Sequence, residues 1–364
     1  MRNTAIGLLA LCAGTAALSV PALAQTAPIL LERIAVPGAP LLSFDISWVD
    51  AETQTYYFTD RSNKSVDFID AKTNAFLGRV EGFVGQKDSL EISGPNGVIA
   101  LPKLKQVWAA DGDSTVKVID MAARPPKIIA TFSTGGKNRA NVMAYDEDDN
   151  LLLVTNGSEE IPYVSLISTA PDHKIMGQIK FPNASEGTRA PVWDKIGKHF
   201  YLSLPELDKD HAKGAIAEID PKTMAVSRLI PVSECQGAGL AFGPDQQLLV
   251  GCSGDAIKQG FKPKSLIVDV KSGTVAFTIP EVGGSDQVWY NAGDGRYYLA
   301  ARDMPGGSVL GVIDAKTGKW IANVPTAKNA HSVAANAGNN HIFVPLTPNP
   351  DCPDGCVGVY GLAK

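Results

Sequence analysis

Glu218-Ile219-Asp220-Pro221-Lys222-Thr223 contains the pattern that decides the fold, namely apolar residues, an aspartate and a short polar turn. The pattern returns along the chain in Phe68–Thr73, Val118–Asp120, Val268–Gly273 and Ile313–Gly318. A serine or a tyrosine replaces the aspartate in two further copies, so the seven copies are marked by Asp70, Asp120, Ser168, Asp220, Asp269, Asp314 and Tyr360. The copies lie roughly 45 to 52 residues apart, and a repeat of this length made of short strands and turns is typical of a β-propeller blade.

Each repeat contains four predicted strands. In the second repeat they cover residues 97–100, 106–110, 115–119 and 127–132. The aspartate at the end of the third strand is expected to be structural, because its carboxylate can accept hydrogen bonds from the N–H groups of the turn that follows.

The two ends of the chain complete one another. The last repeat stops at Lys364, one strand short, whereas the strand Ile29–Val36 has no partner in the first repeat. Pairing this strand with the last repeat closes the ring and removes both exposed edges. The sequence therefore predicts an all-β, seven-bladed β-propeller in which the N-terminal strand completes the last blade.

The first residues have the features of a secretory signal peptide. Arg2 precedes an apolar run from Ala5 to Leu18, and the small residues of Val20–Ala24 predict cleavage before Gln25. A lipoprotein signal would use Cys12, but Leu11 stands where a small residue is needed. We therefore predict a signal peptide over residues 1–24, a single propeller domain over residues 25–364, and a periplasmic location. No later segment reaches the ~20 apolar residues of a membrane span.

Composition and charge exclude some partners. Hydrophobic residues make up 45% of the chain, charged residues 20%, and the formal net charge is −5. Nucleic-acid binding needs a clustered positive surface, so no nucleic-acid partner is expected. The expected partner is a small molecule or another protein.

Four cysteines remain after removal of Cys12. Cys352 and Cys356 close a tight loop, and Cys235 and Cys252 flank a hairpin in which antiparallel pairing would place them opposite each other. Two disulfides are predicted, as suits an oxidising compartment. Buried free thiols are the alternative, and a zinc site has no histidine at ligand spacing.

The loops suggest which face carries a site. Loops that join blades, or that join second to third strands, lie on one face of a propeller, and here they include the long insertions 81–94, 204–214, 253–264 and 346–356. Turns on the opposite face are short. Because loops longer than the scaffold needs are usually functional, we expect the site over the central channel on the long-loop face.

Polar residues begin most of the inner strands, at the mouth of that channel. Asp45, Asn96, Asn141, Gln236, Asp286 and His331 stand at equivalent positions, and Arg139 and Arg189 lie just before two of the strands. The arginines could hold a carboxylate or a phosphate, or could be solvated charges. The candidate ligand-binding residues are Asp45, Asn96, Asn141, Arg189 and Gln236, although a hydrated channel would also explain such residues.

His331 and Asp286 are the candidate catalytic residues. His331 is the one histidine of the sequence that begins an inner strand, and a hydrogen bond to Asp286 on the adjacent blade would raise its basicity. Alternatively, His331 ties two blades together. No cofactor is identified: a divalent cation could bind, but there is no haem-attachment motif.

Two segments point to a known family. The sequence resembles the YVTN (YncE-like) propeller repeats in Val107–Asp111 followed by Val116–Asp120, and in Leu152–Gly157. More loosely, it resembles the heavy-chain propellers of quinoprotein amine dehydrogenases. The resemblance implies a seven-bladed periplasmic propeller, in a family whose members range from binding proteins to enzyme subunits.

Three functions remain open. The first is an exported YncE-like propeller that binds a small molecule or a metal at the channel mouth. The second is a lactonase-like, metal-dependent hydrolase, with Asp45, Asn141 and Asp286 holding a divalent cation that polarises a carbonyl and activates water. The third is a non-catalytic propeller subunit of a periplasmic, amine-dehydrogenase-type redox enzyme.

Overall fold

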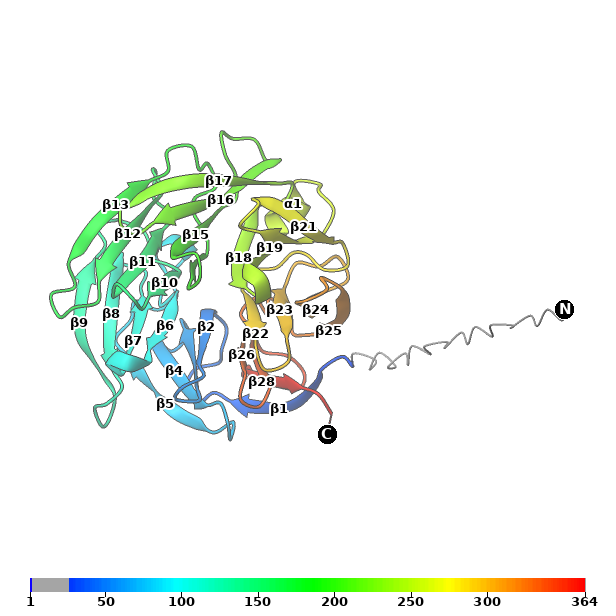
Figure 1. Cartoon of the computed structure of the whole chain (residues 1–364). Helices are drawn as coiled ribbons and strands as arrows, with labels where there is room; N and C mark the ends of the chain where they lie inside the picture. The colour runs from blue at the N-terminus through cyan, green and yellow to red at the C-terminus, as the bar shows by residue number, and fades with distance from the viewer. Residues whose placement is uncertain (2–25, 364) are drawn as a thin grey trace.

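The computed structural model describes Met1 and residues 26–363, and these form seven four-stranded antiparallel sheets arranged in a ring (Figure 1). The prediction of an all-β, seven-bladed propeller is confirmed. The segment predicted to be a signal peptide lies, apart from Met1, outside the described residues.

The strands occupy equivalent places in every blade. The inner strands are β2 (Phe44–Asp50), β6 (Val98–Leu101), β10 (Met143–Asp146), β14 (Pro191–Asp194), β18 (Gly237–Phe242), β22 (Val288–Asn291) and β26 (Ala334–Asn336). The second strands are β3 (Thr55–Asp60), β7 (Gln106–Ala110), β11 (Leu151–Asn156), β15 (His199–Leu204), β19 (Gln247–Cys252), β23 (Arg296–Ala301) and β27 (His341–Leu346). The third strands are β4 (Ser65–Asp70), β8 (Thr115–Asp120), β12 (Tyr163–Ser168), β16 (Lys213–Asp220), β20 (Ser265–Asp269), β24 (Val309–Asp314) and β28 (Cys356–Gly361). The outer strands are β5 (Phe76–Glu81), β9 (Lys127–Ser133), β13 (Ile175–Lys180), β17 (Ala225–Ser233), β21 (Thr274–Ile279), β25 (Trp320–Pro325) and β1 (Ile29–Ala35).

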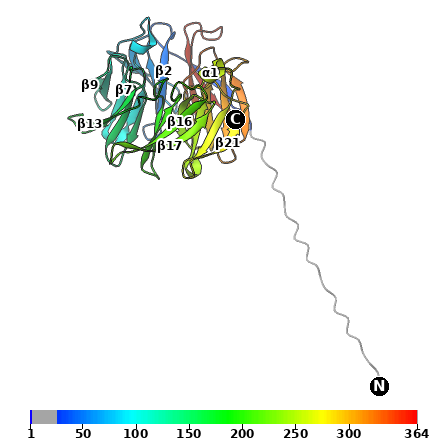
Figure 2. The same ribbon diagram turned by 90° about the horizontal axis from the view of Figure 1, so that it is seen from above.

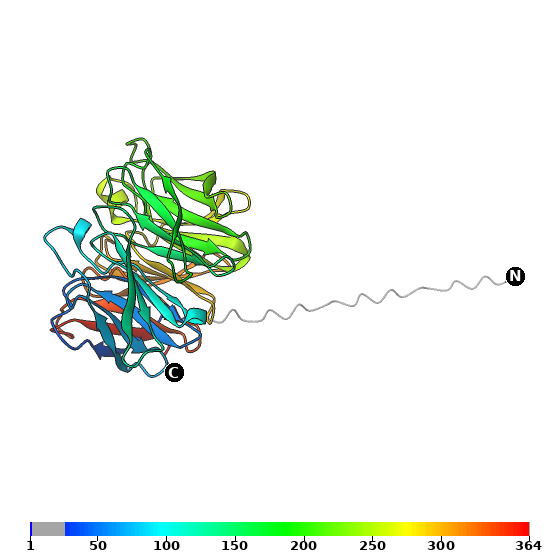
Figure 3. The same cartoon turned by 90° about the vertical axis from the view of Figure 1, so that its left-hand side faces the viewer.

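The ring closes as the sequence predicts. Strand β1 pairs antiparallel with β28, from Ile29 opposite Gly361 to Ala35 opposite Cys356. Figure 3 shows the blue N-terminal strand beside the red C-terminal blade. Inside the ring, the side chain of Gln287 links the sixth, seventh and first blades: its Oε1 accepts from Ser332 Oγ at 2.7 Å, and its Nε2 donates to the carbonyl oxygen of Ser47 at 2.6 Å.

The repeated aspartates have the predicted structural role. Asp70 Oδ1 accepts hydrogen bonds from the N–H groups of Lys72 and Thr73, both at 2.9 Å, and Asp220 Oδ1 accepts from Lys222 N at 2.8 Å. These N–H bonds hold the pKa of Asp70 and of Asp220 below the usual value. The inner strands end in the same way, since Asp50, Asp146, Asp194, Asn291 and Asn336 each accept from an N–H two residues later.

The core is divided between the blades. Within residues 26–363, seven clusters of buried apolar side chains lie one at each interface between adjacent sheets. The cluster between the last and first blades contains Ile34 and Val36 from the N-terminal segment, packed with Phe44, Tyr56 and Phe343. Closure of the ring is therefore a matter of core packing as well as of strand pairing.

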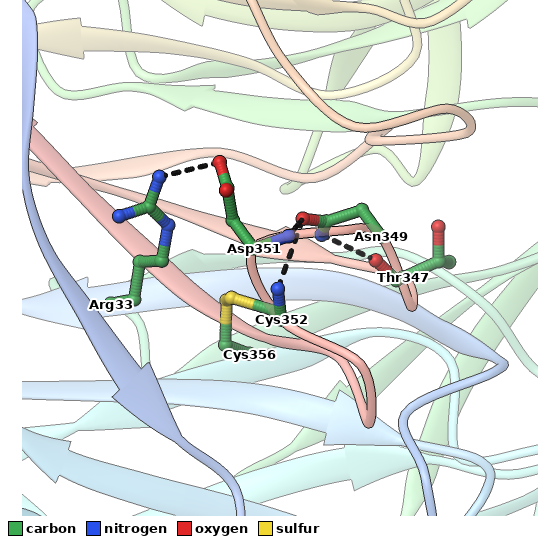
Figure 4. The surroundings of a disulfide bond; sticks show 6 residues. All are labelled: Arg33, Thr347, Asn349, Asp351, Cys352 and Cys356. Atoms are coloured by element: carbon green, nitrogen blue, oxygen red, sulfur yellow. Dashed lines mark hydrogen bonds and ion pairs between the residues drawn. A yellow bond between two sulfur atoms is a disulfide. The ribbon is translucent and has the colours of Figure 1, made fainter.

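Both predicted disulfides are present among the described residues. Cys235 and Cys252 join the two sides of the β18–β19 hairpin, with Cα atoms 4.5 Å apart, and Cys352 pairs with Cys356 at a Cα separation of 6.0 Å. Figure 4 shows the second of these, where Arg33 of β1 also pairs with Asp351 at 2.7 Å.

The long loops share one face of the ring, as expected. In Figure 2 the strands run across the thickness of the ring, so that the loops project from its two faces. The loop after β5 contains the 3-10 helix η1 (Leu90–Ile92), and the loop after β19 contains the helix α1 (Gly254–Lys258). Two further 3-10 helices, η2 (Pro102–Leu104) and η3 (Pro244–Gln246), occupy turns of the opposite face.

Candidate functional site

A cavity of about 830 Å³ follows the axis of the ring. Its middle part, which we call the shaft, is lined by apolar side chains in the inner strands or directly beside them: Ile46, Val98, Val142, Leu240 and Val288. On the long-loop face the lining becomes polar. We call this end the channel mouth; its charged lining is formed by Asp45, Arg61, Glu91, Arg139, Arg189, Asp286, Arg302 and His331.

Five of the predicted site residues line this cavity: Asp45, Asn141, Arg189, Asp286 and His331. The structure thus brings together side chains from five blades. Asn96 and Gln236 lie outside the lining. Asn96 is buried behind the mouth and donates to the carbonyl oxygen of Ala140 at 3.0 Å, whereas Gln236 turns toward Glu206 Oε2 at 3.3 Å.

Asp45 is the partner of a buried arginine that the sequence analysis did not identify. Arg61 directly follows β3 and its side chain is 4% exposed. Its guanidinium pairs with Asp45, donates from Nε to Asn96 Oδ1 at 3.2 Å and reaches the carbonyl oxygen of Phe44 at 3.2 Å. Burial lowers the pKa of Arg61, and the charge of Asp45 opposes that shift. Asp45 and Asn96 therefore position a cation at the mouth.

Asp286, just before the inner strand of the sixth blade, has a similar partner. Arg302 Nη2 lies 3.2 Å from Asp286 Oδ2, and its Nε lies 3.3 Å from Asp303 Oδ2. Burial by itself would raise the pKa of Asp286, but Arg302 and the other cations of the mouth outweigh it and lower the pKa. Asp286 is consequently an ionised carboxylate at neutral pH.

His331 forms contacts between two blades. Its Nδ1 lies 2.7 Å from the carbonyl oxygen of Asn329, its Nε2 lies 3.2 Å from that of Phe44, and its ring stacks on the Phe44 ring with centroids 4.6 Å apart. Burial, with a smaller contribution from Arg302, lowers the pKa of His331. Asp45 Oδ1 is 3.9 Å from Nε2. These contacts match the blade-linking interpretation, since both ring nitrogens face main-chain oxygens.

Arg139 is the least satisfied cation of the mouth. Its side chain is only 13% exposed, yet its one ion pair among the described residues is with Asp45, at 4.0 Å, and Asp45 already pairs with Arg61. Its Nε is buried without a partner, as is Oδ1 of the neighbouring Asn141. Arg189, whose side chain is 35% exposed, lies 3.4 Å from Asp255.

The two arginines missed by the sequence analysis share a position. Arg61 and Arg302 are each the first residue after the second strand of a blade, and therefore lie on the same face as the starts of the inner strands. That equivalence is visible in the sequence, but only once the strand ends are known.

This arrangement is suited to binding an anion. A guanidinium is planar and always charged, and it binds carboxylate or phosphate through paired N–H groups. Asp45 and Asp286, the proposed cation ligands, each pair with an arginine. In the described part of the chain, no group of three or more His, Cys, Asp or Glu side chains is arranged to hold a metal ion.

None of the helices in the described part of the chain has both the length and the apolar character that a membrane-spanning helix requires.

Comparisons with known proteins support the fold. No protein-family model matches the chain, and no curated protein sequence matches it. Among solved structures, a chain of the crystal structure of mitotic checkpoint complex is similar over 100% of both chains, with a TM-score of 0.68 and 11% sequence identity. At that identity the likeness shows the propeller fold alone, so the YncE-like resemblance stays a prediction.

Proposed function

We propose that the protein is an exported, periplasmic propeller that binds a small organic anion at the channel mouth. The carboxylate or phosphate of the ligand contacts Arg139 and Arg189, and its apolar body lies in the shaft. The cavity, at about 830 Å³, is of the size typical of small-molecule sites.

The observation that carries this proposal is the state of Arg139. The guanidinium is mostly buried, and its nearest carboxylate is 4.0 Å away and shared with Arg61. Its Nε is buried with no hydrogen-bond partner among the described residues. Burial of a charge is costly unless it is paired and hydrogen-bonded. A bound anion would supply both the missing charge and the missing acceptors.

The location rests on two supports. Residues 1–24 have the sequence features of a secretory signal, and two cysteine pairs lie at bonding distance. Disulfides persist in oxidising compartments such as the bacterial periplasm. The proposed binding role corresponds to the first of the three functions considered from the sequence, the YncE-like one.

Isothermal titration calorimetry of the mature protein with hexanoate, hexyl phosphate and hexylamine tests the proposal. We expect one of the anions to bind and the amine not to bind. Arg139→Gln should weaken anion binding at least tenfold, which is about 1.4 kcal/mol, while Arg33→Gln, which removes an equal charge from β1 outside the channel, should have no effect. Binding of hexylamine as tight as that of the anions, or an Arg139→Gln variant that binds like the parent, would overturn the proposal.

The same titration separates the alternatives. Anion binding through arginines should be unchanged by EDTA. Loss of binding on chelation would favour the metal-dependent hydrolase, and co-purification of a cofactor-bearing subunit from the periplasm would favour the redox-enzyme subunit.

A further inference from the structure

A second cavity, of about 680 Å³, lies beside the channel mouth on the loops of the third and fourth blades. We call it the side cavity. It shares Glu91, Arg139, Asn141 and Arg189 with the lining of the channel, so the two cavities meet at these side chains. A ligand held at Arg139 can therefore extend into the apolar shaft and into the side cavity at once.

Part of the side cavity's wall is bare backbone. A Cβ atom on Gly157 would overlap the carbonyl oxygen of Thr188, and one on Gly187, where φ is +77°, would overlap the carbonyl oxygen of Gly157. The two loops touch through their main chains, which leaves the space beside them open. Thr188 is 3% exposed, and its hydroxyl is buried with no partner in the described structure.

The charges of the side cavity differ from those of the mouth. Besides Arg139 and Arg189, its charged lining consists of Glu91, Glu159, Glu160, Glu186, Asp208 and Lys209. Apart from the two arginines, the lining of the side cavity therefore has more carboxylates than cations. A second anionic group placed there would meet like charges, whereas a cationic group would meet several carboxylates.

Glu159 is the carboxylate that the structure holds in place. Its Oε1 accepts hydrogen bonds from the N–H groups of Lys137 and Asn138, both at 2.7 Å. Gly136 allows this approach, because a Cβ there would overlap Glu159 Oε1. The other oxygen, Oε2, forms no hydrogen bond or ion pair within the described residues. Glu159 therefore presents a fixed, half-buried negative charge with one oxygen available for a ligand.

We propose that the ligand is a zwitterion, an amino-carboxylate whose carboxylate binds Arg139 and whose ammonium group enters the side cavity and binds Glu159. This inference rests on the proposed function, because it assigns the anionic end of the ligand to Arg139. It adds the chemical class of the ligand and a second binding residue. On binding, the ammonium group exchanges its hydrogen bonds to water for hydrogen bonds to Glu159 Oε2 and to acceptors such as Asn141 Oδ1.

Calorimetry with four six-carbon probes tests the inference: hexanoate, 2-aminohexanoate, 6-aminohexanoate and hexylamine. All four probes have six carbon atoms. They differ in whether they carry a carboxylate, whether they carry an amine, and where the amine is attached. We expect at least one of the two amino acids to bind the mature protein ten times more tightly than hexanoate, and hexylamine to bind least. The probe that binds more tightly reports the separation of the two charge-binding groups.

Glu159→Gln is the matched variant, since the glutamine Oε1 can still accept from both N–H groups while the charge is lost. It should remove the preference for the amino acid and leave hexanoate binding intact. Glu281→Gln, which neutralises an exposed glutamate outside both cavities, should leave the preference unchanged.

The outcomes distinguish this inference from the proposed function. Suppose that hexanoate binds in an Arg139-dependent way, but neither amino acid binds more tightly than hexanoate. The proposal of a zwitterionic ligand is then wrong, and the proposed anion site stands. A preference that survives in Glu159→Gln also overturns the proposal of a zwitterionic ligand. If hexyl phosphate binds but no carboxylate does, the amino-carboxylate is overturned and the anion site stands. If neither hexanoate nor hexyl phosphate binds, or if Arg139→Gln has no effect on binding, the proposed function itself fails.

Discussion

Asp60 and Asp67 are two buried carboxylates that share one arginine. Arg79 Nη2 lies 2.7 Å from Asp67 Oδ2 and 4.0 Å from Asp60 Oδ2, and neither carboxylate is exposed to solvent. Burial, together with the negative charge of Asp60, raises the pKa of Asp67 to about 7. Burial also raises the pKa of Asp60. The folded protein therefore retains a proton that the unfolded chain would release.

We expect Asp67 to make the folded state less stable as the pH rises from about 4 to about 7. In this window the folded protein binds more protons than the unfolded chain, so the free energy of unfolding must fall with pH, by up to about 4 kcal/mol for a carboxyl whose pKa is about 7 in the folded protein. Asp67→Asn should remove this component. Urea denaturation of both proteins at several pH values measures it.

An exposed aspartate provides the control for that measurement. Asp88→Asn should leave the pH dependence of the parent unchanged. If the difference in unfolding free energy between the parent and Asp67→Asn is constant across pH 4 to 7, the proton on Asp67 does not contribute to the pH dependence of stability.

At the residue scale, the sequence predicted where the mouth residues lie better than what they contact. The equivalence of inner-strand starts was enough to bring Asp45, Asn141, Asp286 and His331 together. The partners Arg61 and Arg302 were not identified, because an ion pair depends on side-chain directions that no repeat pattern contains. Gln236, whose backbone φ is 41°, turns toward Glu206 instead of the channel, and no repeat pattern predicts this direction.

The Cys235–Cys252 disulfide stabilises a single hairpin. It closes a loop with a sequence separation of 17, for which chain entropy predicts about 3 kcal/mol of stabilisation. Cys352–Cys356, with a separation of 4, should contribute less, about 2 kcal/mol. Replacing each pair by serines and measuring unfolding free energies tests this order.

Thiol counting provides an independent check on the disulfides. If the protein is exported as proposed, denatured protein that lacks residues 1–24 and is purified from the periplasm without reductant should contain no free thiol. One or more reactive thiols per chain would contradict the pairing.

At the element scale, the strand order and the turn aspartates were predictable, but the irregularities of register were not. In each of the first six blades, the register between the third and outer strands shifts at the residue directly before the one that marks the repeat. Examples are Ile69, before Asp70, and Ile119, before Asp120. A shift of this kind depends on the partner strand and on the twist of the sheet. It leaves no mark in the apolar pattern of one strand.

The closure of the ring predicts the effect of an N-terminal truncation. A mature protein that starts at Pro40 lacks β1, so it leaves the edge of β28 unpaired and removes Ile34 and Val36 from the core. We expect a lower melting temperature and self-association, because exposed edges pair with other chains. Size-exclusion chromatography and thermal unfolding, compared with protein starting at Gln25, measure both effects. A monomer with the melting curve of the longer protein would show that β1 is dispensable.

At the scale of the whole molecule, the seven blades and the closing strand were both visible in the sequence, because the repeat spacing counts blades and the leftover strand identifies the seam. The positive charge of the channel mouth was not visible in the sequence. The formal net charge of −5 describes the chain as a whole, whereas the four arginines of the mouth come from four different blades.

The pairing of β1 with β28 also sets an order in time. Ribosomes make Ile29 long before Gly361, so the first strand of the propeller must wait for all the other blades before its neighbour exists. Contacts between such distant segments form slowly. If the protein crosses the inner membrane as proposed, β1 emerges first and stays open throughout translocation. We therefore expect the pairing of β1 with β28 to be a late folding step, and the exported chain to be prone to aggregation until it occurs.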